Sequence, residues 1–129
     1  MDFKDLDVWK RSARLSADIY KATQGLRDYG FRDQLTRSGL SVPSNIAEGV
    51  DRLSDKETVQ FLSVAKGSAA ELETQILIGM EIAYISREQG KSWIAEVNDI
   101  RAMLTGLIKR YKRAISESSN QRVSGSMIR

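Results

Sequence analysis

The residues best placed to do chemistry are cations near the C-terminus of this 129-residue chain. Basic side chains neutralise phosphate groups and release their counterions, so a dense cluster of them can bind RNA or DNA without reading its sequence. The alternative is that these cations end a helix and stabilise its dipole without binding a partner. Both interpretations stay open at the level of the residues. The candidate nucleic-acid-binding residues are Arg101, Lys109, Arg110, Lys112 and Arg113.

Charge is distributed unevenly along the chain. Residues 101–129 carry seven basic side chains and one acidic, a net charge of +6, whereas residues 1–100 carry 13 basic and 16 acidic, a net charge of −3. A polyanionic partner is therefore expected to bind at the C-terminal end. A second basic set is mixed with aspartates and is expected to be an ordinary solvated face. It comprises Lys10, Arg11, Arg14, Arg32 and Arg37.

Several polar residues fall inside or beside apolar stripes. One interpretation makes Glu48 and Glu71 a carboxylate pair for acid–base work or for a weak hard-cation site, but no nucleophile accompanies them. The other interpretation, which we favour, is a buried hydrogen-bond network that fixes helix register, with Arg37 or Arg52 as further partners. The predicted members of this structural network are Asn45, Glu48, Ser68, Glu71 and Gln75.

The chain contains no His and no Cys. This composition excludes disulfides, thiolate nucleophiles, His- or Cys-ligated metals and the usual Ser-His-Asp triad. We therefore expect no enzymatic activity, no metal site and no cofactor.

The first half of the chain predicts two helices from apolar residues at 3.6-residue spacing. The first covers residues 6–24, with Asp5 or Asp7 as N-cap and Gly25 as C-cap. The second opens at residues 28–30 and runs to Val50. It contains the single proline, Pro43, and we expect one helix kinked there rather than two helices.

The second half predicts two more helices. Ser54 and Glu57 form a capping box that starts a helix over 55–86, which is apolar on more than one face and so hints at self-association. A loop at 89–90 leads to the fourth helix, which begins at residues 91–92 and places Tyr111 on its apolar seam. Tyr111 is therefore predicted to be a core residue and not a platform for base stacking.

Together these patterns predict an all-α, antiparallel up-down-up-down four-helix bundle over residues 1–115. Residues 116–129 form a polar tail that buries too little apolar surface to become ordered by itself. Glycines within the predicted helices each cost up to about 1 kcal/mol relative to alanine, so a close helix–helix approach is expected at each of them. They are Gly67, Gly79 and Gly106.

No segment predicts a membrane span or a targeting signal. The longest apolar run, residues 76–80, is far shorter than the ~20 residues that a spanning helix needs. We expect a cytoplasmic protein that does not bind a membrane.

Beyond these patterns, the run Gln34-Leu35-Thr36-Arg37-Ser38-Gly39-Leu40-Ser41-Val42-Pro43-Ser44-Asn45-Ile46-Ala47-Glu48-Gly49 resembles the signature of a bacterial four-helix bundle family, the proteins encoded in intervening sequences of 23S rRNA genes. Further pieces match the family in order, and the resemblance covers about residues 3–113: Asp7-Val8-Trp9 near the start, Phe61-Leu62 with Ala65-x-Gly67-Ser68-x-x-Glu71-Leu72, and Ala83-Tyr84-Ile85. The chain has Gly25-Leu26-Arg27 where the family usually has Phe-Pro, which affects only a loop.

The resemblance implies a left-handed bundle that assembles into a ring-like homopentamer and has no catalytic residues. A related branch, the accessory variability proteins of diversity-generating retroelements, forms a basic barrel that binds a reverse transcriptase and nucleic acid. We therefore expect a non-enzymatic homo-oligomer that binds RNA or DNA through symmetry-repeated basic patches. The alternative is a scaffold that docks a partner protein such as a reverse transcriptase. By position, the signature residues Asn45, Glu48, Gly49, Ser68 and Glu71 look structural.

Overall fold

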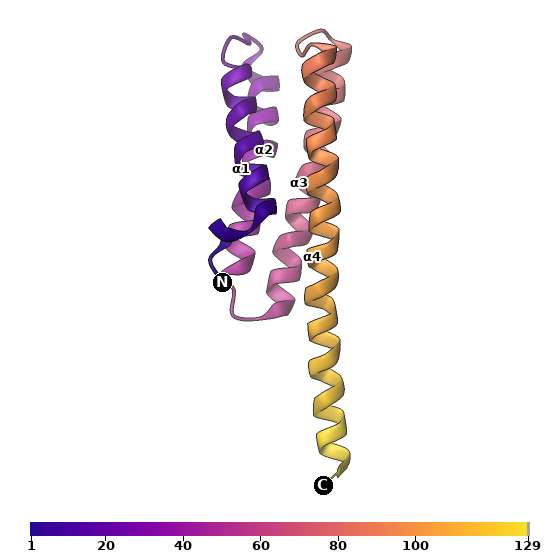
Figure 1. Cartoon of the computed structure of the whole chain (residues 1–129). Helices are drawn as coiled ribbons and strands as arrows, with labels where there is room; N and C mark the ends of the chain where they lie inside the picture. Colours follow the sequence, from indigo (N-terminus) through magenta and orange to yellow (C-terminus); the bar gives the residue numbers. More distant parts are fainter. Residues whose placement is uncertain (129) are drawn as a thin grey trace.

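The computed structural model describes the backbone of residues 1–128 and the side chains of residues 1–120. It contains a short 3-10 turn, η1 (Phe3–Asp5), and four helices: α1 (Asp7–Ala22), α2 (Tyr29–Val50), α3 (Asp55–Glu81) and α4 (Arg87–Ile128). Short loops join consecutive helices, which run in alternating directions (Figure 1). The prediction of an all-α four-helix bundle is confirmed.

The core lies along the inner face of every helix, where the apolar residues recur at helical spacing. Leu35 and Ile46 of α2, Leu62 and Ile76 of α3, and Leu104 of α4 are fully buried. Burying one such side chain stabilises the fold by about 1.5–3 kcal/mol, so the four stripes together specify the bundle.

The start of α3 is as predicted, whereas both ends of α1 differ. The backbone N–H of Glu57 donates to Ser54 Oγ at 3.2 Å, which confirms the Ser54 cap. Neither Asp5 nor Asp7 caps α1, because η1 leads directly into the helix and the N-cap is Leu6, which has no side-chain cap. Gly25 is not the C-cap either. The chain leaves α1 at Thr23, whose hydroxyl donates to the Ile19 carbonyl at 2.7 Å and so satisfies the helix end.

Pro43 lies inside α2, which is one helix from Tyr29 to Val50 as predicted. Proline has no N–H to donate to the carbonyl of Gly39 four residues earlier. Both residues are buried against neighbouring helices, and this packing supports the helix through the missing bond. The bend at Pro43 stays a prediction.

The turn between α3 and α4 differs from the prediction. α3 ends at Glu81 rather than residue 86, because Ala83 has a positive φ of 62° and the N–H groups of Tyr84 and Ile85 both donate to the Gly79 carbonyl. The return of the chain presses Ile85 against Gly79, where an added Cβ would lie 3.0 Å from Ile85 Cγ1. The same Cβ would lie 3.1 Å from Phe31 Cζ of α2, so the close helix–helix approach expected at Gly79 is confirmed.

α4 begins earlier than predicted and extends farther. Ser86 Oγ accepts the N–H of Gln89 at 3.1 Å, so the helix starts at Arg87 and Gly90 lies inside it. At its other end α4 continues to Ile128 through the segment expected to be a polar tail, and it extends past the other three helices (Figure 1). Adding residues to an existing helix avoids the cost of nucleation, which is why a polar segment can continue it. No helix within residues 1–128 has both the length and the apolar character needed to span a bilayer.

Tyr84 ties the α3–α4 turn to the start of α2. Its hydroxyl donates to Asp28 Oδ2 at 3.1 Å, while Asp28 Oδ1 accepts the N–H of Phe31 at 3.1 Å as the N-cap of α2. The hydrogen bond to Asp28, and then the carboxylate charge, raise the pKa of Tyr84 above its ordinary value of 10. A raised tyrosine pKa means that the folded state favours the neutral phenol.

We expect Tyr84→Phe to be less stable than the wild type below about pH 10 and equally stable above the raised pKa, where the tyrosinate no longer donates a hydrogen bond to Asp28. Thermal unfolding of both proteins across this range measures the difference. The control is Tyr29→Phe, which removes the hydroxyl of an exposed tyrosine next to Asp28 in the sequence. A constant difference for Tyr84→Phe would contradict the role of this hydrogen bond.

Candidate nucleic-acid interface

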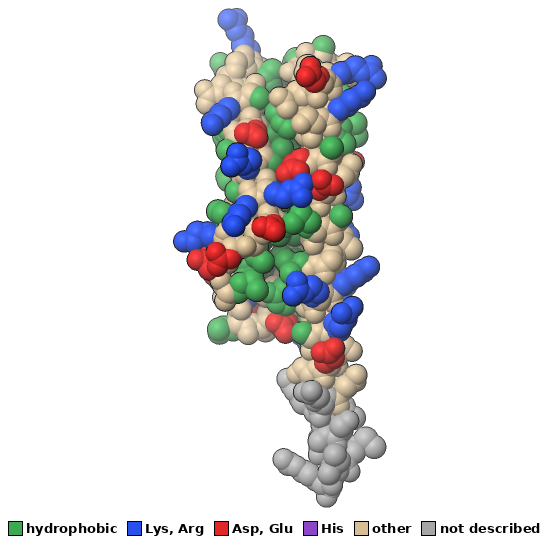
Figure 2. All heavy atoms as spheres, viewed as in Figure 1, with side chains coloured by type: hydrophobic (Ala, Val, Ile, Leu, Met, Phe, Trp, Pro, Cys, Tyr) green, Lys and Arg blue, Asp and Glu red, His purple; other side chains and the backbone are tan. Residues whose placement is uncertain are grey.

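Four of the predicted cations form a continuous exposed surface on α4, which we call the α4 basic face: Lys109, Arg110, Lys112 and Arg113. At 3.6 residues per turn, their Cα atoms cover an arc of about 160° around the helix. None of the four forms an ion pair with another described residue. In Figure 2, blue side chains gather along the lower part of α4, whereas blue and red alternate above. The four charges are therefore available to a polyanion.

Tyr111 lies on the opposite side of α4 from these cations. It is half-buried and packs against the apolar core. The prediction that Tyr111 is a core residue is confirmed, so the α4 basic face has charge but no aromatic ring among its own residues.

Arg101 does not join the α4 basic face. Its Nη1 lies 3.6 Å from Glu73 Oε1 of α3, and its Nε is buried without a hydrogen-bond partner among the described residues. Arg101 therefore belongs to the contact between α3 and α4. The sequence analysis grouped Arg101 with the other four cations because of its charge alone.

The predicted polar network is smaller than expected. Asn45 Nδ2 donates to the Ser41 carbonyl at 2.8 Å, and the Ser41 hydroxyl lies 2.8 Å from the Ser68 hydroxyl, which links α2 to α3. The sequence pattern brought Asn45 and Ser68 into the network but did not identify Ser41 as the residue between them. A small hydroxyl one turn before an asparagine on the same face is the signal that could have found it.

The other three predicted members do not join this network. Glu48 pairs with Arg52 one turn along the exposed side of α2, and Glu71 is exposed on α3. Gln75 Oε1 is buried and has no hydrogen-bond partner in the part of the chain that the structure describes. The structure does not bring Glu48 and Glu71 together as a carboxylate pair. Within the described residues, no group of three or more acidic side chains is placed to hold a metal ion.

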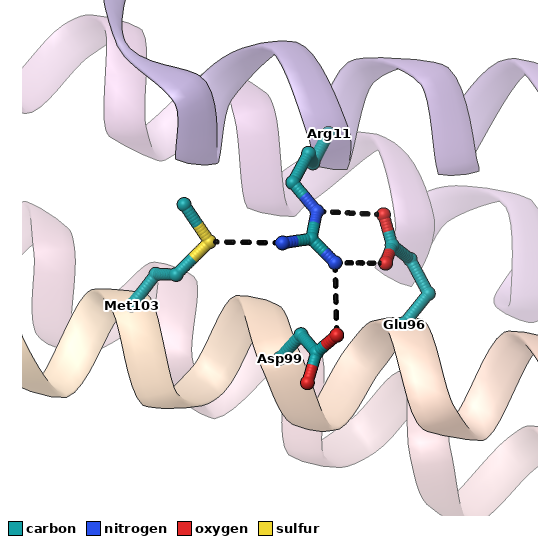
Figure 3. Close-up of polar contacts among 4 residues, drawn as sticks. All are labelled: Arg11, Glu96, Asp99 and Met103. Carbon is teal, nitrogen blue, oxygen red and sulfur yellow. Dashed lines mark hydrogen bonds and ion pairs between the residues drawn. The ribbon is translucent and has the colours of Figure 1, made fainter.

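The main polar cluster between α1 and α4 is centred on Arg11, which the sequence assigned to a solvated face. Its Nε donates to Glu96 Oε2 at 3.1 Å and its Nη2 donates to Asp99 Oδ2 at 2.9 Å and also to Glu96 Oε1 (Figure 3). Nη1 completes the set with Met103 Sδ at 3.6 Å. The hydrogen bonds to Glu96, and next those to Asp99, raise the pKa of Arg11 above its ordinary value.

An open groove of about 610 Å³ runs beside this cluster between α1 and α4. Leu15 and Trp93 are buried beneath it, and Arg14 and Asp18 lie along its α1 side. The carboxylates on its α4 side, Glu96 and Asp99, are already bonded to Arg11. The α1 side carries Lys21 as well, so the groove mixes cations with carboxylates and lacks the single sign of charge that the α4 basic face has.

The sequence pattern predicted that α3 is apolar on more than one face, and some of its apolar residues do lie on the surface. Val64 is 53% exposed and Ile78 48% exposed, on the side of α3 opposite the core. Gly67 lies between them, and an added Cβ there would meet nothing within 4 Å. Among the described residues, the close approach expected at Gly67, and likewise at Gly106, is therefore absent. We call Val64, Gly67, Glu71 and Ile78 the α3 outer face.

Comparisons of the sequence and of the fold with known proteins identify a family and a similar solved structure. The sequence model of the 23S rRNA-intervening sequence proteins matches residues 4–106. The fold is similar to a crystal structure of a protein of unknown function from the S23 ribosomal protein family of Bacteroides thetaiotaomicron. The two chains are 27% identical and superpose with a TM-score of 0.75, over 79% of this chain and 98% of that one.

No curated protein sequence gives a significant match. The family match ends before Lys109, so the α4 basic face lies outside the part of the chain that defines the family. The matched part includes most of the bundle, with the α2 signature and the links between α2 and α3. The chain belongs to the family of 23S rRNA-intervening sequence proteins.

Proposed function

We propose that this protein is a non-enzymatic homo-oligomer that binds RNA or DNA through the α4 basic face, repeated by the symmetry of the assembly. The observation that carries the proposal is the exposure of four cations on one arc of α4, with no ion pair to another described residue. Several copies of a weak site acting together bind far more tightly than one copy, so a net charge of only +3 per chain is sufficient.

The α3 outer face supports self-association. Its exposed apolar side chains are the surface that a neighbouring subunit would cover. The family resemblance favours a pentamer. Light scattering tests this part of the proposal: a mass of five times 14.5 kDa is expected, and a mass of 14.5 kDa would contradict it.

The binding test removes the four charges of the α4 basic face. We expect the wild type to bind structured RNA or duplex DNA with a Kd near or below about 1 µM at about 50 mM salt, and more weakly as salt rises. Replacing Lys109, Arg110, Lys112 and Arg113 with glutamine should weaken binding by about tenfold or more and flatten the salt dependence. Mobility-shift titrations measure both quantities.

The matched control replaces four exposed cations elsewhere, namely Lys10, Arg14, Lys21 and Arg27. Both variants lose four positive charges, so a general effect of net charge would weaken both equally. We expect the control to retain binding within about threefold of the wild type. Equal losses in the two variants would contradict a specific role for the α4 basic face.

A second candidate function is a scaffold that docks a partner protein such as a reverse transcriptase. The exposed apolar side chains of the α3 outer face favour it, because they would serve a partner protein as well as another copy of this chain. Co-purification of one specific protein, unchanged by nuclease treatment and lost on replacing Val64 and Ile78 with serine, would support this function. Retention of the partner by that variant would contradict it.

A further inference from the structure

The four cations of the α4 basic face are not equivalent in their positions around the helix axis. At 100° per residue, Arg110 and Lys112 lie about 160° apart and form the two flanks of the face. Lys109 and Arg113 lie between them, within about 40° of one another and one turn apart along the axis. The helix therefore presents two central cations with one cation on either side.

The surroundings of these cations leave that side of α4 accessible. Ala102 and Gly106 precede them on the same side of the helix and are both exposed, and an added Cβ at Gly106 would meet nothing within 4 Å. Beyond the cations, α4 continues past the end of the bundle (Figure 1). Glu117, one turn after Arg113, ends the basic face with the opposite charge. A rod-shaped ligand can thus approach the central cations of α4 from outside. On one flank, Arg110 also lines a groove with Met1, Leu6 and Asp55.

Among polyanions, B-form duplex DNA fits this arrangement best. Its major groove is about 12 Å wide and admits an α-helix of 10–12 Å diameter, with a row of phosphates on each side. The major groove of A-form RNA is too narrow and deep to be entered in this way. Single strands are held chiefly by stacking on aromatic side chains, whereas Tyr111 packs into the core.

We propose that the basic segment of α4 enters the major groove of B-form duplex DNA. Arg110 and Lys112 contact phosphates of the two opposite strands, and Lys109 and Arg113 point toward the base edges on the groove floor, where cations favour guanine. This inference rests on the proposed function, and it specifies which polyanion that same site prefers.

The test compares binding of the wild type to four probes of one sequence and length: duplex DNA, duplex RNA, single-stranded DNA, and duplex DNA whose cytosines carry glucosylated hydroxymethyl groups that fill the major groove. At about 150 mM salt, we expect plain duplex DNA to bind about tenfold or more tightly than each of the other three. Netropsin, which occupies the minor groove, should leave this binding unchanged.

Two single variants separate the flank from the centre. Arg110→Gln removes a phosphate contact and should weaken binding to both duplexes alike, reducing the slope of log K against log salt by about 0.9 for DNA. Arg113→Gln should reduce the preference for duplex DNA over duplex RNA by about tenfold. An equal loss of preference in both variants would overturn the assignment of the two roles.

The outcomes also distinguish this inference from the proposed function. Equal binding to plain and glucosylated DNA, or equal or tighter binding to duplex RNA, would overturn groove insertion while leaving nucleic-acid binding intact. Absence of binding to all four probes at about 50 mM salt would overturn both. A preference for plain duplex DNA that is lost on glucosylation supports the inference.

Discussion

Gly49→Ala is expected to lower the free energy of unfolding by about 2 kcal/mol. Gly49 is buried near the end of α2, where an added Cβ would lie 2.9 Å from Phe61 Cβ and 3.4 Å from the Thr58 carbonyl oxygen. Phe61 cannot easily move away, because its Cβ is attached directly to the backbone of α3 and its ring lies under the Arg52 guanidinium at 4.5 Å. Alanine would gain up to about 1 kcal/mol in helix propensity, but the cost of this overlap exceeds the gain.

Gly67→Ala is the matched control, because it makes the same change within α3 where the added Cβ meets nothing within 4 Å. Here only the helix propensity changes, so the free energy of unfolding should rise by about 0.5–1 kcal/mol. Denaturant unfolding gives both values, measured at a protein concentration low enough to dissociate the proposed homo-oligomer. Two changes of the same sign would contradict the difference in packing between the two glycines.

Arg11→Ala is expected to cost about 2 kcal/mol. Breaking a fully buried ion pair costs about 3–5 kcal/mol and an exposed pair contributes at most about 1 kcal/mol. The Arg11 side chain is 39% exposed, so the value lies between these limits after allowance for solvent screening. The variant leaves Glu96 and Asp99 on one face of α4 without the cation that offsets the repulsion between their carboxylates. It also removes the hydrogen bonds of the guanidinium that join α1 to α4.

A double-mutant cycle with Glu96→Gln separates the pair from the packing of the arginine stem. We expect a coupling energy of about 1 kcal/mol between Arg11 and Glu96, decreasing at high salt. Arg14→Ala, three residues along α1 and exposed, is the control and should change stability by less than about 0.5 kcal/mol. A coupling energy near zero would show that the Arg11–Glu96 pair in Figure 3 contributes nothing to stability.

The four helices could be predicted because each has a single stripe that is buried, and burial follows the spacing of the apolar residues. Their ends were harder to predict where the apolar spacing continues beyond the helix. Ile82 and Ile85 keep the period of α3, yet Ile82 is the C-cap and Ile85 packs back onto Gly79. The positive φ of Ala83 that produces this turn has no signature in the sequence, because alanine is not a residue that usually marks one.

The polar residues likewise include some that could be predicted from the sequence and one that could not. Lys109, Arg110, Lys112 and Arg113 were predicted from local charge density, which needs no knowledge of the fold. Arg11 was missed because its partners lie 85 and 88 residues away, and nothing in the local sequence separates it from its exposed neighbours Lys10 and Arg14.

The family signature in α2 can now be divided by what each residue contacts. Asn45 and Gly49 are explained by the contacts between α2 and α3, through Ser41 and Phe61 respectively. Glu48 faces outward and pairs with Arg52 of its own helix. The packing within this chain therefore accounts for Asn45 and Gly49, whereas Glu48 forms no hydrogen bond or ion pair between helices among the described residues.

The Arg11 cluster also bears on the order in which the chain folds. The contacts of α2 with α3 and of α3 with α4 close over short loops, whereas Arg11 meets Glu96, Asp99 and Met103 across 85 to 92 residues. Closing such a long loop has the largest entropy cost, so this seam forms after the local hairpins have created its other side. The same reasoning predicts that, within the bundle, the amides of α1 exchange with solvent before those of α2 and α3 when the native protein opens locally.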